Sequence, residues 1–200
     1  MSGASTSDFG KDNGLVHETV VMGRKAGWGR DAWSRLAENE ALMRSLLPVI
    51  MGFAHVEVDT HVVDCTAAPF LPEGWRVAPA NKQIASRFTG ELMLTPEALA
   101  LYLDPGQQSD GVVKGDELKK LLEGQPVLPA NVLDYLIAHP ALIPESWKGQ
   151  YLFFWGTVYR LADGALYVRY LYWSGGAWVW DYRWLDSGFG SARPAAVPAS

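Results

Sequence analysis

The alternation of apolar and polar residues is clearest near the end of the chain, between Tyr151 and Leu185. Aromatic and β-branched residues form three runs there, separated by the segments ADG at 162–164 and SGG at 174–176. Alternation with a period of two is typical of strands, and short glycine-containing segments such as these are typical of tight hairpin turns. The pattern predicts three antiparallel strands, followed by a short closing strand at 195–197.

The last of the three strands has two dissimilar faces, because consecutive side chains of a strand point in opposite directions. One face carries four large aromatic residues. Their joint exposure would promote aggregation, so we expect most of that face to lie in the core. The faces are Trp178, Trp180, Tyr182 and Trp184 on one side, and Ala177, Val179, Asp181, Arg183 and Leu185 on the other.

The first fifty residues show helical rather than strand-like periodicity. Residues 1–13 are polar and predict a mobile tail. A first helix is expected over 14–25. A second helix is expected to begin with Asp31 as its N-cap and to continue toward Leu47, where Pro48 would disturb or end it.

The middle of the chain combines one strand signal with several helix signals. Valines alternate with polar residues near 55–65, which indicates a strand. Thr95, followed by proline and glutamate, is a strong helix start, and the helix is expected to run to Leu103. Two further short helices are expected over 116–123 and 129–139.

These elements predict an α+β protein in which N-terminal and middle helices pack with a C-terminal antiparallel sheet. The expected organisation is a mainly helical support region over 14–145 and an aromatic-rich sheet over 146–200. We expect the two regions to form one compact unit.

Composition narrows the class of protein. The chain has 200 residues, 48% of them hydrophobic and 20% charged, which describes a globular protein. The net charge of -5 argues against a large nucleic-acid footprint, and no apolar run is long enough to span a membrane. With a single cysteine and no signal-peptide pattern, we expect a cytoplasmic protein, although export without a cleaved leader stays open.

One stretch has residue types suited to binding a metal ion. His55, Glu57, Asp59 and His61 would project from one face of a strand, and imidazole and carboxylate groups bind zinc and other divalent ions. Neighbouring side chains on one face of a strand lie about 7 Å apart, so at most two of them could grip one ion. A solvated polar strand face is therefore the favoured interpretation. A metal-dependent enzyme is the alternative.

The remaining candidate residues favour structural roles. Cys65 follows His61 closely, but cysteine is among the most buried residue types, so a buried structural thiol is favoured over a nucleophile. His17 is isolated. His139 lies near a helix C-terminus, where an imidazole can meet free carbonyl groups. The sequence predicts no catalytic residue and no cofactor.

The C-terminal run VRYLYWSGGAWVWDYRWLDSGFGSAR, with tryptophans spaced W-x4-W-x-W-x3-W-L-D, resembles the variable proteins of bacterial diversity-generating retroelements. The segments FFWGTVYR and LPANVLDYLIAHPALIPESWKG resemble an uncharacterised bacterial group with such a C-terminus. In those systems mutagenic reverse transcription rewrites adenine-containing codons near the end of the gene. The usual fold is C-type-lectin-like and the usual role is ligand binding. The frame positions match Trp173, Trp178, Trp180, Trp184 and Leu185.

The resemblance implies a ligand-binding protein that displays a diversifiable surface and recognises an unknown protein or other macromolecular partner. A metal-dependent enzyme and a structural or self-assembly protein remain as alternatives. Between the tryptophans lie side chains of mixed size and polarity, which suits a binding surface on a rigid frame. The expected ligand-binding residues are Ser174, Gly175, Gly176, Ala177, Val179, Asp181, Arg183, Ser187, Gly188, Gly190, Ser191 and Ala192.

Overall fold

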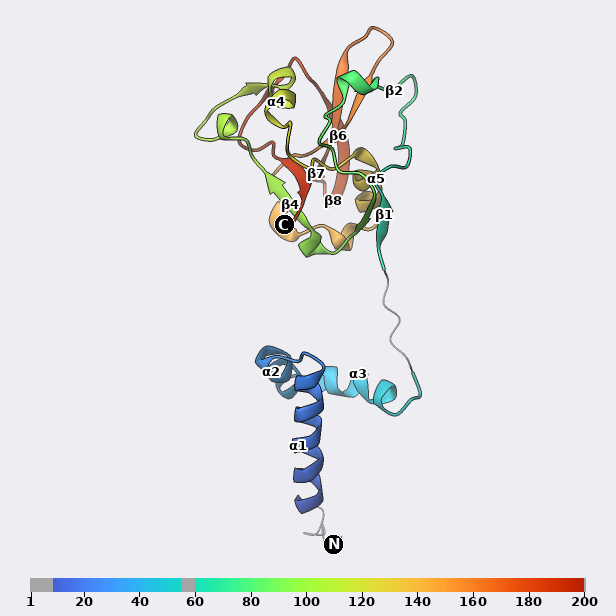
Figure 1. Ribbon diagram of the computed structural model, residues 1–200, viewed down its shortest axis with the longest axis vertical. Coiled ribbons are helices and arrows are strands. Elements are labelled where there is room, and N and C mark those ends of the chain that lie inside the picture. Colours follow the sequence, from blue (N-terminus) through green and yellow to red (C-terminus); the bar gives the residue numbers. More distant parts are fainter. Residues whose placement is uncertain (1–8, 55–59, 200) are drawn as a thin grey trace. The chain divides into compact units, whose positions relative to one another are not determined.

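The computed structural model describes residues 9–54 and 60–199, and it confirms the α+β class. The chain divides into two compact units, Met1–Val58 and Asp59–Ser200. The first unit contains helices, and the second contains the sheet with its own helices (Figure 1). No helix among the described residues is both long and apolar enough to cross a bilayer.

The N-terminal unit contains three helices, α1 (Phe9–Lys25), α2 (Arg30–Glu38) and α3 (Glu40–Ile50). The first helix begins at Phe9 rather than at residue 14, so part of the predicted tail is helical. The predicted continuous second helix is interrupted at Asn39, whose side chain accepts a hydrogen bond from the Leu42 amide and caps α3. Pro48 does not end α3, which continues to Ile50.

The three predicted C-terminal strands are present as β6 (Leu152–Arg160), β7 (Leu166–Ser174) and β8 (Ala177–Trp184). The closing strand β10 (Ala195–Pro198) is also present, but it inserts between β6 and β4 (Leu99–Tyr102). The sheet order is β4-β10-β6-β7-β8, and every pair is antiparallel except β10 with β6. A short strand, β2 (Arg76–Val77), pairs with the far end of β6.

Two small ladders complete the strand pairing. The strand β1 (Val62–Asp64) pairs with β3 (Glu91–Met93), and β5 (Val113–Lys114) pairs with β9 (Gly188–Phe189). Only β1 represents the strand predicted near 55–65, because residues 55–59 lie outside the described residues. The predicted short helices correspond to α4 (Gly115–Leu121) and α5 (Ala130–Ala138).

The helix predicted from Thr95 to Leu103 is wrong. Only one 3₁₀ turn, η2 (Pro96–Ala98), follows the expected cap, and the chain then continues as β4. Pairing with β10 gives the backbone of this segment its hydrogen-bond partners, with Leu101 opposite Ala196. Other 3₁₀ turns are η1 (Ala80–Lys82), η3 (Pro105–Gln107), η4 (Pro140–Leu142) and η5 (Glu145–Trp147).

The sheet has a core on each side. On one side α5 packs through Leu133 and Leu136 against Phe154, Leu171 and Trp178. The other core joins the α4 region to the opposite sheet face. It includes Leu118, Leu122, Phe153, Trp155, Val168, Leu185 and Phe189. Alternating residues of β7 and β8 therefore enter different cores, as the period-two pattern predicts.

Candidate functional site

The second core covers only part of its sheet face, and the remainder is open to solvent. Val168 is fully buried, whereas the next two residues on that face of β7, Tyr170 and Tyr172, are half-buried. Across the strand pair, Asp181 lies opposite Tyr170 and Val179 lies opposite Tyr172. We call this surface the open face. It comprises Tyr151, Tyr170, Tyr172, Val179, Asp181, Arg183 and Arg193.

Three tyrosines form the aromatic part of the open face. The ring centroids of Tyr151 lie 5.6 Å from those of both Tyr170 and Tyr172, and the latter two are 5.4 Å apart. Tyr170 also packs against Phe153 of the core, at 4.8 Å. The mutual contacts fix the ring positions while leaving part of each ring exposed. Rigid, partly exposed tyrosines supply contact area at a small entropic cost on binding.

The polar groups of the open face lie beside these rings. The Tyr170 hydroxyl donates to Oδ2 of Asp181 at 3.3 Å, and the Asp181 Oδ1 atom accepts from the Tyr182 amide. Arg183 donates from Nε and Nη2 to the Gly188 carbonyl. Arg193 lies over the Tyr151 ring, and its guanidinium makes no hydrogen bond or ion pair with any described residue.

The two arginines are close enough to influence each other. Burial, and then the charge of Arg193, lowers the pKa of Arg183. Two guanidinium groups thus share a surface with one carboxylate, Asp181, in a protein whose net charge is -5. The open face is therefore a locally positive, aromatic surface suited to acidic groups.

The Tyr170 hydroxyl gives this surface a pH-dependent property. Burial, and then the nearby Asp181 charge, raises the pKa of Tyr170 from 10.0 to about 12. In that interval the unfolded chain loses the phenolic proton while the folded protein keeps it, so stability falls as pH rises. We expect Tyr170→Phe to show a smaller fall than the wild type. Denaturant midpoints measured across this pH interval check it, and equal slopes would contradict it.

The expected ligand-binding residues fall into three groups. Val179, Asp181 and Arg183 lie on the open face and are half-buried, as are Ser187 and Gly188. Gly190 is buried, and its carbonyl accepts hydrogen bonds from the Gln107 side chain and the Arg193 amide, so it offers no binding surface. Two turns hold the exposed residues, which are Ser174, Gly175, Gly176, Ala177, Ser191 and Ala192.

Four residues of the open face were not among those expected from the sequence. Tyr170 and Tyr172 could have been found, because the period-two pattern of β7 places them beside Val168. Tyr151 and Arg193 could not be assigned from the pattern. They reach the open face because β10 inserts beside β6, so that the Tyr151 amide donates to the Ala192 carbonyl.

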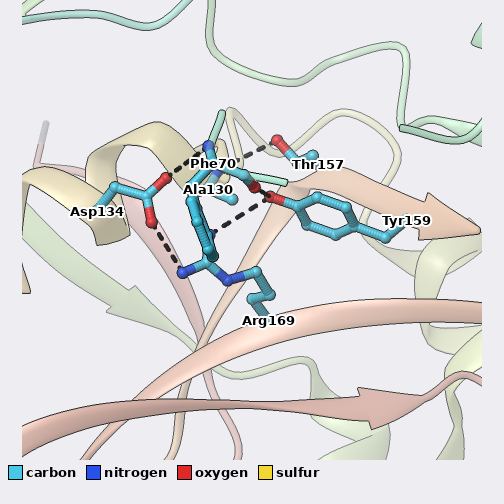
Figure 2. A network of polar contacts seen from close by, with 6 residues as sticks. All are labelled: Phe70, Ala130, Asp134, Thr157, Tyr159 and Arg169. Carbon is cyan, nitrogen blue, oxygen red and sulfur yellow. Dashed lines mark hydrogen bonds and ion pairs between the residues drawn. The ribbon is translucent and has the colours of Figure 1, made fainter. Parts of the chain in front are cut away.

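The opposite sheet face contains a buried polar network that fixes β7 to α5 (Figure 2). Arg169 is 1% exposed, and its Nη2 atom lies 2.8 Å from Oδ1 of Asp134 on α5. Asp134 also accepts a hydrogen bond from the Phe70 amide, while the Tyr159 hydroxyl donates to the Phe70 carbonyl. The guanidinium lies over the Trp180 ring at 4.1 Å. This network therefore supports β6 and β7 from the sheet face opposite the open face.

The aromatic face of β8 is only partly core. Trp178 is buried and Trp180 is half-buried, but Tyr182 and Trp184 are 46% and 47% exposed. Trp75 contacts the Tyr182 ring at 4.7 Å and provides partial cover. The prediction of a buried aromatic face therefore holds for one end of the strand and not for the other.

The metal hypothesis is tested only in part. His55, Glu57 and Asp59 lie outside the described residues. His61 is half-buried, and its Nδ1 atom lies 3.0 Å from the Tyr135 hydroxyl. Within residues 9–54 and 60–199, no group of three or more histidine, cysteine or carboxylate side chains is placed to hold a metal ion.

The other single residues occupy structural positions. Cys65 is buried, and burial followed by the Asp64 charge raises the pKa of its thiol to about 11, so at neutral pH it is not a thiolate nucleophile. The Nδ1 atom of His139 lies 3.0 Å from the Tyr135 carbonyl at the end of α5, which confirms the prediction for this residue. His17 is exposed on α1.

No protein-family model, curated protein or solved structure matches the chain. The C-type-lectin-like fold and the kinship with retroelement-diversified proteins therefore stay predictions.

Proposed function

We propose that the chain is a ligand-binding protein whose C-terminal sheet displays a sequence-tolerant surface, as in the variable proteins that its C-terminus resembles. The observation that carries the proposal is the open face. Tyr170 and Tyr172 are partly exposed on β7, whose opposite side is packed. Tyr151 lies beside them just before β6, and Arg193, which has no polar partner among the described residues, lies over the Tyr151 ring from the loop before β10. Exposed aromatic and arginine side chains on a rigid support are typical of energetically important interface residues.

The proposed ligand is an acidic segment of a partner protein. Arg193 can pair with a carboxylate without first breaking an ion pair within the described residues. Tyr151 and Tyr172 provide flanking rings, and the exposed β7–β8 turn borders them. Neither core includes Val179 or the residues of the β7–β8 turn, so these positions can change as a diversified surface requires.

Arg193→Ala and Tyr172→Ala are each expected to weaken binding about tenfold or more while leaving the melting temperature nearly unchanged. The probe is a displayed library of random peptides selected on the full-length protein, from which acidic sequences should be enriched. Affinities of the enriched peptides are then measured for each variant. Arg87→Ala is the control, because Arg87 is an exposed arginine in a loop and is not part of the open face.

Two outcomes would overturn the proposal. One is the absence of any enriched peptide, and the other is unchanged affinity in both variants. The hypothesis that the surface is diversified by a retroelement is tested separately, in the gene. A near-copy of its 3′ end, differing mainly at adenines and adjacent to a reverse transcriptase gene, would support it. A locus without these features would contradict diversification but not ligand binding.

A further inference from the structure

The outer edge of β8 is unpaired. β8 is the last strand in the order β4-β10-β6-β7-β8, and its eight residues pair with β7 without a register shift. Natural edge strands are usually protected by proline, lysine, a bulge or a covering segment. β8 contains no proline or lysine, and no described residue forms a backbone ladder on its outer side. Such an edge is a template for another strand.

The turn before β8 determines which backbone groups face outward. Gly175 and Gly176 have φ angles of 59° and 85°, which define a two-residue type I′ hairpin turn. The closing pair, Ser174 and Ala177, is then hydrogen-bonded, and bonded pairs recur at every second residue. The residues that direct N–H and C=O groups away from β7 are therefore Trp178, Trp180, Tyr182 and Trp184.

Most of these outward groups have no partner among the described residues. The exceptions are the Tyr182 amide, which donates to its neighbour Asp181 at 2.7 Å, and the Trp184 carbonyl, which accepts from Ser187. The first contact is local and can be exchanged for a cross-strand bond. The second leaves a lone pair free, because a carbonyl oxygen accepts two hydrogen bonds.

We propose that two copies of this chain pair through β8, antiparallel, about a two-fold axis at Tyr182. The charges of β8 select this register. It places Asp181 opposite Arg183 of the second copy, twice, at non-hydrogen-bonded positions where side chains are closest. It also aligns the outward backbone groups of Trp180 with those of Trp184 in the second copy.

The neighbouring symmetric registers are less favourable. An axis at Asp181 or at Arg183 sets two like charges directly opposite each other, which is destabilising. An axis at Trp180 sets Asp181 opposite Val179, with no ion pair. On the other sheet face, the Tyr182 register brings together Tyr182 and Trp184, whose exposure of 46% and 47% is otherwise unexplained.

Pairing through β8 goes beyond the proposed binding function, since it requires no ligand. Antiparallel pairing about this axis keeps both open faces on the same side of one continuous sheet. Two identical surfaces would then face a partner together, so a repetitive ligand would be bound with higher avidity.

The test measures self-association of the full chain, without ligand, by sedimentation equilibrium. Asp181→Arg and Arg183→Asp should each weaken dimerisation about tenfold, because each places like charges opposite one another. The double variant Asp181→Arg/Arg183→Asp should restore it, since the pairs re-form with signs exchanged. Glu117→Arg makes the same change of charge as Asp181→Arg, but on α4, and should have no effect. Rescue also separates the interface from any folding defect of the single variants.

A covalent test fixes the register. In a Cys65→Ser background, Tyr182→Cys should form an intermolecular disulfide on mild oxidation, because hydrogen-bonded antiparallel pairs have Cα atoms about 5.5 Å apart. Glu117→Cys in the same background should not. A wild-type chain that stays monomeric at tens of micromolar, or a double variant that associates no better than the single ones, would overturn the proposal. Neither result bears on peptide binding by Arg193.

Discussion

Asp134→Ala is expected to lower the free energy of unfolding of the C-terminal unit by about 3–5 kcal/mol. Its partner Arg169 is 1% exposed, and the ion pair between them spans 2.8 Å. Without Asp134, a guanidinium remains buried with no carboxylate, and its Nε atom already lacks a hydrogen-bond partner. The Phe70 amide loses its acceptor as well. Denaturant unfolding followed by tryptophan fluorescence measures the loss.

A double variant tests whether the loss of stability arises from the unpaired charge of Arg169. Asp134→Ala combined with Arg169→Met removes both partners, and replacing a buried pair with apolar groups is often nearly neutral. We therefore expect the double variant to be more stable than Asp134→Ala alone. Asp186→Ala is the control, because its ion pair with Lys114 is exposed and contributes about 0–1 kcal/mol. A loss equal to the control's would contradict the importance of the Arg169 network.

The alternating pattern was sufficient to locate the C-terminal hairpins. β6, β7 and β8 follow from residue type alone, because strong alternation and glycine turns agree at the same positions. The same pattern separates Val179, Asp181 and Arg183 from the tryptophans.

The segment after Thr95 shows where local signals fail. Thr95, Pro96 and Glu97 favour a helix start, and one 3₁₀ turn does form there. Leu99–Tyr102 instead becomes a strand, because β10, nearly a hundred residues later, supplies a ladder partner. Long-range pairing of this kind overrides local propensity and leaves no trace in a short window.

The sequence did not reveal part of the open face, or the polar network on the opposite sheet face, for a related reason. A charged residue in a strand is normally assigned to solvent, so Arg169 gave no sign of being buried, and Asp134 lies on a separate helix. Tyr151 and Arg193 likewise join the open face only through the insertion of β10. Residues brought together by topology require the fold, whereas residues on one strand do not.

Gly156→Ala is expected to lower the free energy of unfolding by about 3 kcal/mol, the upper part of the range for overpacking. A Cβ atom at Gly156 would lie 2.7 Å from the Val127 carbonyl oxygen, the Leu128 carbonyl carbon and the Pro129 nitrogen. These are backbone atoms of the segment that leads into α5, and the Gly156 amide donates to the Leu128 carbonyl. The added methyl group therefore cannot be accommodated by a side-chain rotation.

The position of Gly156 explains why the cost should spread beyond one contact. It lies in β6 between Phe153 and Val158, where the register with β7 shifts, and fully buried residues of both cores flank it. Moving the chain at Gly156 would displace α5 and, with it, the Asp134 partner of Arg169. Gly190→Ala is the matched control, because its added Cβ would meet neighbours only at 3.6 Å and beyond. If both alanine variants unfold at the same denaturant concentration, the close packing of α5 on β6 is not what stabilises this unit.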